Sequence, residues 1–385
     1  MTPEPWSANI PIVGVLVTDG VRLNKSRAPE DLRLTERFCR QVAARDPLRA
    51  DALLSSLPEM NARADLPELT RALRALISAY HADPPGDTVG RLAAMRDIGM
   101  LLGSLKRHGV EPLAAVPEAR GPLLALGAAT DMVPRDTVLH YGPWNPTGAR
   151  QRMFVGAREE TVLIDAVRRT APAIEDATLA LAGLAGTDVA DPAFAVAGRR
   201  AVARLEVLPE VMRTVGRVVD PARFFAARLR PFMEDVEVDG RRYYGPAAAH
   251  VPLHLLDRVV WSADHGDAVH SALQDDLIDY GLPAWRRLYA RDEGRETLVT
   301  RVVRAVREAG GAGPELLPSV EVVSDLLRVL IVFRGRHSPM VKAAYTDNEN
   351  YCAGSAGASP DVVRHILELT RRCAEALRSA TGRHG

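Results

Sequence analysis

The chain has 385 residues, with 49 Lys and Arg against 49 Asp and Glu, a hydrophobic fraction of 47% and a charged fraction of 25%. This balance excludes a general electrostatic attraction to nucleic acids or anionic membranes, and the composition is that of an ordinary folded protein. Three widely spaced cysteines without a CxxC pair argue against a zinc site or a disulfide framework. We find no signal-peptide pattern and no apolar run of ~20 residues, so we expect a soluble cytoplasmic protein.

The N-terminal part begins with an irregular stretch and continues in helices. Residues 1–30 are rich in proline, glycine and β-branched residues, which predicts an arm with one short strand around 10–17. Apolar residues at spacings of three and four predict an amphipathic helix over Leu66–His81. A second helix is predicted over Thr88–His108, because cations in a last turn followed by a glycine are a common helix stop.

The sequence of the second part of the chain predicts further helices, with one β-hairpin between them. Long helices are expected over Glu159–Leu184 and Ala193–Val219, as an antiparallel pair. The alternating segment Val236–Tyr244, which contains an Asp-Gly pair, predicts a small β-hairpin. Helical patterns resume over residues 253–261, 267–280, 296–309, 320–333 and 359–379. We expect a nearly all-α fold with an arm (1–30), a smaller helical domain (31–150) and a larger helical domain (151–385).

A histidine follows the most apolar of these segments. His337 ends the sequence Phe333-Arg334-Gly335-Arg336-His337. On a helix Arg334, three residues earlier, would face the same way. An imidazole for iron and a guanidinium for a propionate carboxylate would together suit a heme. The alternative is a helix C-terminus whose cations complement the helix dipole. The segment alone leaves both interpretations open.

Two further segments combine groups that could bind an amino acid. Phe224-Phe225 and Leu229-Arg230-Pro231-Phe232 place an arginine for a carboxylate beside aromatic rings, and an ordinary helix end is the alternative. Tyr345 precedes a polar loop and then Gly354-Ser355-Ala356-Gly357. The N–H groups of such a loop could bind a carboxylate or a phosphate, and a flexible linker is the alternative.

Histidines also occur in two places outside these segments. His140 and Tyr141 precede a loop, Trp144-Asn145-Pro146-Thr147, that carries many aromatic and hydrogen-bonding groups, and a tryptophan that anchors the loop explains it equally well. His250 and His254 are four residues apart, as metal ligands on one helix face would be. Because Pro252 lies between them and no HExxH pattern is present, we interpret them as surface or packing residues.

Taken in order, several segments resemble the tryptophan/indoleamine 2,3-dioxygenase superfamily, and within it most closely the branch typified by monodechloroaminopyrrolnitrin synthase. The resemblance extends from about Asp46 to Leu377. The segments that carry it are Ala94–Gly99, Gly103–Gly109, Trp144–Thr147, Leu229–Phe232, Tyr244–Pro246 and Phe333-Arg334 with His337.

The resemblance implies the all-helical heme dioxygenase fold and a heme b cofactor. His337 falls where the family has its proximal iron ligand, and Arg334 where an arginine contacts a heme propionate. Arg230 matches the arginine that holds the substrate carboxylate, and Phe225 matches a substrate-contacting aromatic residue. We expect Tyr345 as a further substrate contact.

The same resemblance assigns a role to the glycine-rich loop. Gly354–Gly357 matches the loop that closes over the substrate, with Ser355 in place of the more usual threonine. We expect Ser355 to contact the substrate and Gly354 to contact the cofactor. For the distal, catalytic side the candidate is His140, and the segment Leu163–Asp165 is the alternative.

These residues together predict a heme-dependent oxygenase that oxidises the indole ring of tryptophan, or of a substituted tryptophan, with O2 in specialised metabolism. Dioxygenation, monooxygenation and ring rearrangement all fit. The alternative is a non-catalytic heme sensor or carrier, which is motivated by Ala226, where indoleamine dioxygenases have a second aromatic residue, and by Ala356 in the loop. Relatives form dimers or tetramers, so we expect a homo-oligomer.

Overall fold

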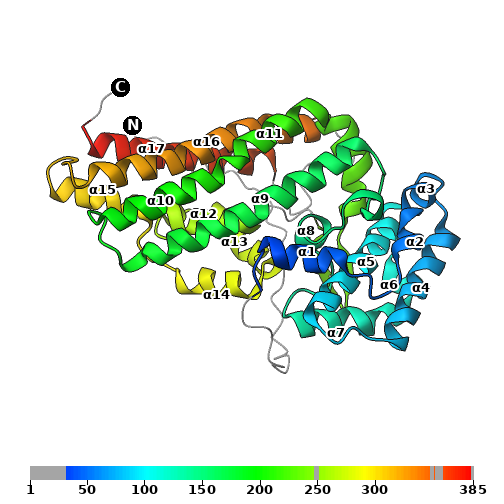
Figure 1. Cartoon of the computed structure of the whole chain (residues 1–385). Coiled ribbons are helices and arrows are strands. Elements are labelled where there is room, and N and C mark those ends of the chain that lie inside the picture. The colour runs from blue at the N-terminus through cyan, green and yellow to red at the C-terminus, as the bar shows by residue number, and fades with distance from the viewer. Residues whose placement is uncertain (1–31, 247–250, 347–350, 352–358, 383–385) are drawn as a thin grey trace.

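The structure is a computed structural model that describes residues 32–246, 251–346, 351 and 359–382. Within these residues the fold is almost entirely helical, with one two-stranded sheet (Figure 1). The predicted all-α fold is thereby confirmed. The predicted arm with its short strand, and the predicted loop contacts Gly354 and Ser355, lie outside the described residues.

Helices α2 to α7 gather at one end of the elongated molecule (Figure 1). The helices of this first part are α1 (Glu36–Ala44), α2 (Asp51–Ser55), α3 (Leu57–Ala62), α4 (Leu66–Ala82), α5 (Thr88–Arg107), α6 (Pro112–Ala115) and α7 (Arg120–Thr130). Both α4 and α5 agree with the predicted helices. They begin after Asp65 and Asp87. The side chain of each aspartate accepts the N–H group of the residue three positions later, which would otherwise have no partner at the start of the helix.

The other end is a bundle in which α9, α10, α11, α16 and α17 lie side by side (Figure 1). The remaining helices of the described residues are α8 (Val138–Tyr141), which packs against α5 and α9, and then α9 (Arg158–Ala182), α10 (Pro192–Leu205), α11 (Val207–Val218), α12 (Val251–Asp257), α13 (Ala268–Leu277), α14 (Pro283–Arg291), α15 (Leu298–Glu308), α16 (Leu317–Tyr345) and α17 (Pro360–Ala380). Both α10 and α11 pack against α9 on one side and against α16 on the other.

Two helices differ from their predicted bounds. The helix predicted over Ala193–Val219 is broken between α10 and α11, because Pro209 has no N–H to donate to the carbonyl of Leu205 and its ring crowds that carbonyl. Conversely, α16 runs beyond its predicted end at Phe333 and contains Pro339. Packing along α17 offsets the cost of this internal proline. The residues after Phe333 therefore belong to the helix and not to its end.

Short irregular turns connect the helices. Two π-helical segments are present, η4 (Pro221–Leu229) and η6 (Arg258–Ser262). The 3-10 turns are η1 (Pro117–Ala119), η2 (Gly148–Arg150), η3 (Gly183–Gly186), η5 (Arg230–Met233) and η7 (Ile278–Tyr280). Because a π-helical turn is wider than an α-helical one and changes the direction of its side chains, such turns are frequent at functional sites. Both Phe225 and Arg230 lie on the irregular stretch formed by η4 and η5.

The predicted hairpin is confirmed as strands β1 (Val236–Val238) and β2 (Arg241–Tyr243). Asp239 and Gly240 form its turn, with φ angles of 54° and 76°. A two-residue turn of this kind requires the left-handed region at both positions, which explains the Asp-Gly pair.

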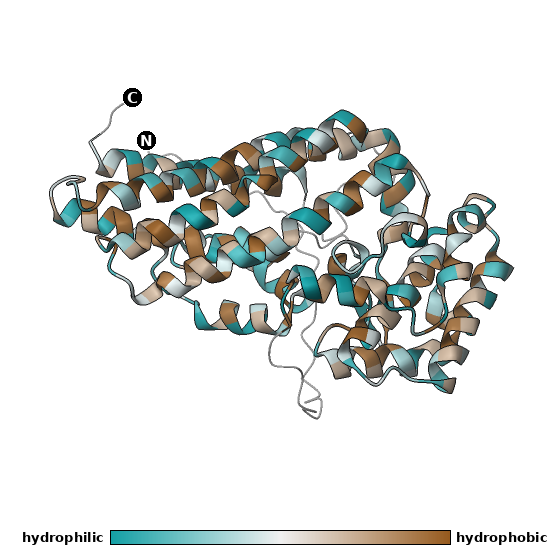
Figure 2. Cartoon of the chain, in the orientation of Figure 1, coloured by the Kyte–Doolittle hydropathy of each residue, from teal (hydrophilic) through white to brown (hydrophobic). Residues whose placement is uncertain are grey.

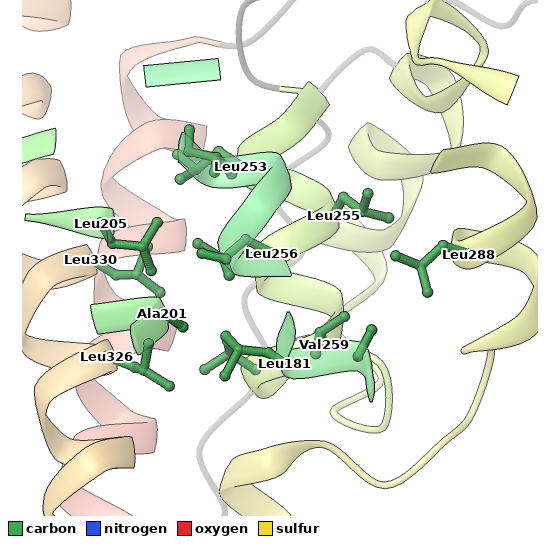
Figure 3. Close-up of a cluster of buried hydrophobic side chains, with 14 of the residues drawn as sticks. Leu181, Ala201, Leu205, Leu253, Leu255, Leu256, Val259, Leu288, Leu326 and Leu330 are labelled. Carbon is green, nitrogen blue, oxygen red and sulfur yellow. The ribbon is translucent and has the colours of Figure 1, made fainter. Parts of the chain in front are cut away.

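The bundle is held together by apolar side chains from several helices. The polar residues lie mostly on the outer faces (Figure 2). Figure 3 shows part of one buried cluster, which contains Leu181 of α9, Leu205 of α10, Leu253 of α12 and Leu330 of α16. Leu253 also lines the cavity described below. Among the described residues, no helix is long and apolar enough to cross a membrane.

Candidate functional site

A cavity of about 260 Å³ lies between α9, α11 and α16. Helices α9 and α16 each present one face to it, with lining residues at helical spacings. These residues are Leu163, Ala166, Val167, Thr170, Ala171 and Ile174 on α9, and Phe333, His337, Met340, Val341, Ala344 and Tyr345 on α16. None of the described lining residues is Asp, Glu, Lys or Arg. The cavity therefore suits a largely apolar ligand.

Of the described residues that line this cavity, His337 alone carries an imidazole. Its ring stacks on Phe333, one helical turn earlier, with the ring centroids 5.7 Å apart and the planes inclined by 17°. Together with His254 and Arg334, His337 also lines a second cavity of about 30 Å³. A cavity of that size can hold an ordered water. The predicted iron ligand thus lies between a large apolar cavity and a small, mostly apolar one whose wall also includes His254 and Arg334.

Arg334 does not line the large cavity and is buried in a polar network. Its Nη2 donates to Oδ2 of Asp257, and its Nη1 donates to Oγ1 of Thr370 at 2.7 Å. The other oxygen of Asp257 accepts the indole N–H of Trp261 at 2.8 Å. Nε2 of His270 lies 3.7 Å from Oδ2 of Asp257, and burial lowers the pKa of His270 to about 4, so this ring is neutral at pH 7. Arg334 and Asp257 compensate each other's charge.

The same network contains three groups with the geometry of a metal site. The ligand atoms of His254, Asp257 and His270 all lie within 4.8 Å of one another, and the three residues are buried. However, Arg334 already neutralises Asp257. A divalent cation would therefore bring two uncompensated positive charges into a buried site, which is unfavourable. We assign no metal to this cluster.

Three predicted substrate contacts are among the described residues: Tyr345 lies about two turns after His337 on α16, and Phe225 and Arg230 lie on η4 and η5. Phe225 and Tyr345 line the cavity. Arg230 itself does not line the cavity, although Leu229 before it and Met233 three residues after it do. Burial raises the pKa of Tyr345, and a hydrogen bond to Arg230 partly opposes that rise. The structure thus places Phe225 and Tyr345 in the cavity wall, and Arg230 beside Tyr345 but outside the lining.

His140 is not among the cavity-lining residues, although Val138 and Tyr141 on either side of it are. Its side chain caps α8, because Nδ1 accepts the N–H of Thr137 at 3.0 Å. Its ring lies edge-on against Trp144, with the centroids 4.8 Å apart. Burial, and then the nearby charge of Arg96, lower the pKa of His140 to about 3. These contacts give His140 a structural role, and its catalytic role stays a prediction.

Tyr141 on α8 and Glu160 on α9 form a pair that the sequence did not indicate, and this pair supports the wall of the cavity. The hydroxyl of Tyr141 donates to Glu160 at 2.7 Å. Glu160 also accepts the N–H groups of Phe154 and Gly156, at 2.6 and 2.9 Å, and burial raises its pKa. Because Tyr141 lines the cavity, this carboxylate fixes part of the wall. A sequence signal for Glu160 did exist, because a glutamate near the start of a helix can reach back to N–H groups just before that helix.

The residues that build this site fall within one known protein family. The model of the family described as monodechloroaminopyrrolnitrin synthase PrnB matches residues 41–383. The match includes both cavity walls, the irregular η4–η5 stretch and the polar network around Asp257. The chain belongs to the monodechloroaminopyrrolnitrin synthase PrnB family.

Proposed function

We propose that the protein is a heme-dependent oxygenase that oxidises the indole ring of tryptophan, or of a substituted tryptophan, with O2 in antibiotic biosynthesis. Membership of a family named for a biosynthetic synthase supports this proposal. The observation that carries it is the position of His337 in the wall of a large apolar cavity.

The apolar side chains of this cavity suit a heme in chemical character. Apolar faces on α9 and α16 suit a porphyrin ring, and histidine is a common axial ligand of heme iron. His337 would hold the iron, and its stacking on Phe333 would restrict rotation of the imidazole. Arg334 lines the small cavity beside His337, but its pairing with Asp257 and Thr370 speaks against a contact with a propionate. When bound, the heme would supply the chemistry that activates O2.

The chain itself would act mainly by holding the substrate in place. Two hydroxyls in the wall are already engaged, since Thr170 donates to the carbonyl of Ala166 and Tyr141 donates to Glu160. No acidic or lysine side chain lines the described part of the cavity. Orientation of the indole, and not proton transfer by a side chain, would therefore be the protein's contribution to the rate.

Absorption spectroscopy of the purified, heme-supplemented protein tests the cofactor. We expect a Soret band for the wild type and loss of the native heme spectrum in His337→Ala, with unchanged helical circular dichroism. His365→Ala is a matched control, because His365 lies on α17, pairs with Asp267 and does not line the cavity. A wild-type protein without a Soret band after supplementation would overturn the proposal.

A non-catalytic heme carrier would also show a Soret band. A turnover experiment is therefore needed to distinguish a carrier from an enzyme. The buried Ala226, which packs beside Ala344 and Tyr345, motivates this second candidate. Tryptophan and halogenated tryptophans would be added without oxygen, followed by isotopically labelled O2 and mass spectrometry. An enzyme gives a new product, and the number of labelled atoms in it distinguishes monooxygenation, dioxygenation and ring rearrangement. A carrier returns the substrate unchanged.

A further inference from the structure

A cysteine, a histidine and an aspartate form a chain of contacts outside the cavity. Sγ of Cys373 on α17 lies 3.5 Å from Nε2 of His265, and Nδ1 of the same ring lies 3.0 Å from Oδ1 of Asp264. None of the three residues lines either of the two cavities described above. A thiol, an imidazole and a carboxylate in this order are the groups with which proteins activate a cysteine for nucleophilic attack. The cluster therefore has the parts of a reactive thiol site.

The surroundings of His265 hold its ring in place and keep it charged. Oδ2 of Asp264 accepts the N–H of Thr297 at 3.0 Å, and the ring of Trp261 stands edge-on to the imidazole with the centroids 6.3 Å apart. Hydrogen bonds of His265 with Asp264 first, and then with Cys373, raise the pKa of His265 to about 10, so its ring is positively charged at pH 7. A positive charge beside a thiol favours the thiolate, which is the nucleophile.

The other cysteine among the described residues has a different environment. Cys39 is also buried, with an exposed fraction of 9% against 3% for Cys373. Burial, and then the charge of Glu175, raise the pKa of Cys39 to about 12, so this side chain stays a neutral thiol at pH 7. A negative charge lies near Cys39, whereas a positive one lies beside Cys373. The sign of the neighbouring charge, and not burial, thus separates the two cysteines.

The burial of Cys373 limits the reagents that can reach its sulfur. His265 contacts the sulfur from the short turn between η6 and α13, and the side chain of His265 is 35% exposed. The imidazole therefore connects the buried sulfur with the solvent, and a small displacement of this turn admits a small molecule. Hydrogen peroxide is such a molecule, and it oxidises thiolates to sulfenic acids.

We propose that Cys373 is a peroxide-reactive thiol, with His265 as its charged partner and Asp264 as the residue that positions the imidazole. The thiolate sulfur attacks one oxygen of hydrogen peroxide, so that an S–O bond forms and the O–O bond breaks. The sulfur is oxidised to a sulfenic acid, and the leaving hydroxide takes the Nε2 proton of His265 and becomes water. This inference goes beyond the proposed oxygenase reaction and does not depend on a heme.

The test measures how fast hydrogen peroxide consumes each thiol of the full-length protein at pH 7. Catalase stops the reaction, the protein is denatured, and the remaining thiols are alkylated and quantified by mass spectrometry. Trypsin places the three cysteines in separate peptides, because arginine or lysine residues lie between them. We expect Cys373 to react at least about tenfold faster than Cys39, and a reducing thiol to restore it, as it restores a sulfenic acid.

His265→Gln should slow the oxidation of Cys373 about tenfold, because glutamine can form a hydrogen bond with the thiol but carries no charge. His365→Gln is the matched control and should leave the rate unchanged. His365 also pairs with an aspartate, with its Nε2 2.8 Å from Oδ2 of Asp267, and it lies on the same helix as Cys373. Circular dichroism checks that both variants keep their helices.

Three results would overturn the proposal. In the first, Cys373 of the wild type reacts no faster than Cys39, which is an outcome that does not depend on how any variant folds. In the second, both histidine variants slow the oxidation equally, so that the contact with His265 is an ordinary structural hydrogen bond. In the third, Cys373 is oxidised only after heme supplementation, so that the heme and not the thiol is the group that reacts with peroxide.

Discussion

Two arginines are expected to bind carboxylates, and their surroundings differ. Arg334 and its partner Asp257 have side chains that are 4% and 0% exposed, and Arg334 also donates to Thr370. Arg230 is 8% exposed, but its partner Glu234 is 33% exposed, and Nε of Arg230 has no acceptor among the described residues. The protein itself thus satisfies most of the first arginine's charge, whereas the second keeps one donor without an acceptor among the described residues. The two arginines are buried to a similar degree, so the difference between them is the burial of the partner carboxylate.

The largest expected effect is the loss of stability when Asp257, the buried partner of Arg334, is removed. Asp257→Ala should lower the free energy of unfolding by about 3–5 kcal/mol, because it leaves the charge of Arg334 buried without compensation. Urea denaturation followed by circular dichroism measures this change. Asp325→Ala is the control on an exposed pair with Arg328, and it should cost at most about 1 kcal/mol. Equal losses in the two variants would mean that the Arg334 network is not structural.

His270 should give the Arg334 network a pH dependence. Burial lowers the pKa of His270 from 6.5 to about 4 in the folded state. Between these two values the unfolded chain binds more protons than the folded one, so stability rises with pH and is lost as the pH falls from 6.5 to 4. The full loss is on the order of 3 kcal/mol. Chemical denaturation at a series of pH values measures it.

His270→Phe isolates this contribution. The ring of His270 stacks on Trp261 with a centroid distance of 4.9 Å, and phenylalanine preserves that stacking while it removes the titration. The unfolding free energy of the variant should therefore fall less steeply below pH 6.5 than that of the wild type. His140, whose pKa is also lowered by burial, contributes equally to both proteins and cancels in the difference. Parallel pH profiles would rule out His270 as the source.

The parts of the fold that local chemistry determines were predictable from the sequence. Helices α4, α5 and α17 combine apolar periodicity with the capping residues Asp65, Asp87 and Ser359, each of which accepts an N–H three residues on. The β-hairpin likewise follows from its Asp-Gly turn. The extension of α16 was not predictable, because packing against α17 outweighs a proline that would end an isolated helix.

For the candidate site, the sequence identifies single residues better than their partners. Residue type and family resemblance single out His337 and Arg230. Asp257 precedes Arg334 by 77 residues, so no local pattern could join them. Glu234 is only four residues after Arg230, yet the backbone between them is a 3-10 turn, so an α-helical rule would not place the two groups correctly. The pairing of charges depends on tertiary structure and on irregular turns.

The smallest expected effect is the coupling within the Arg230–Glu234 pair, measured by a double-mutant cycle with Arg230→Met and Glu234→Ala. Because Glu234 is partly exposed and therefore screened by water, the coupling energy should be about 0.3–1 kcal/mol without a ligand. It should decrease further at 1 M salt, where the Debye length is about 3 Å. A cycle on Arg334→Met and Asp257→Ala should give a several-fold larger coupling that changes little with salt, because both side chains are buried. If the two cycles gave equal energies, Arg230 would be bound to its partner as strongly as Arg334 is, and the burial of the partner would no longer separate the two roles.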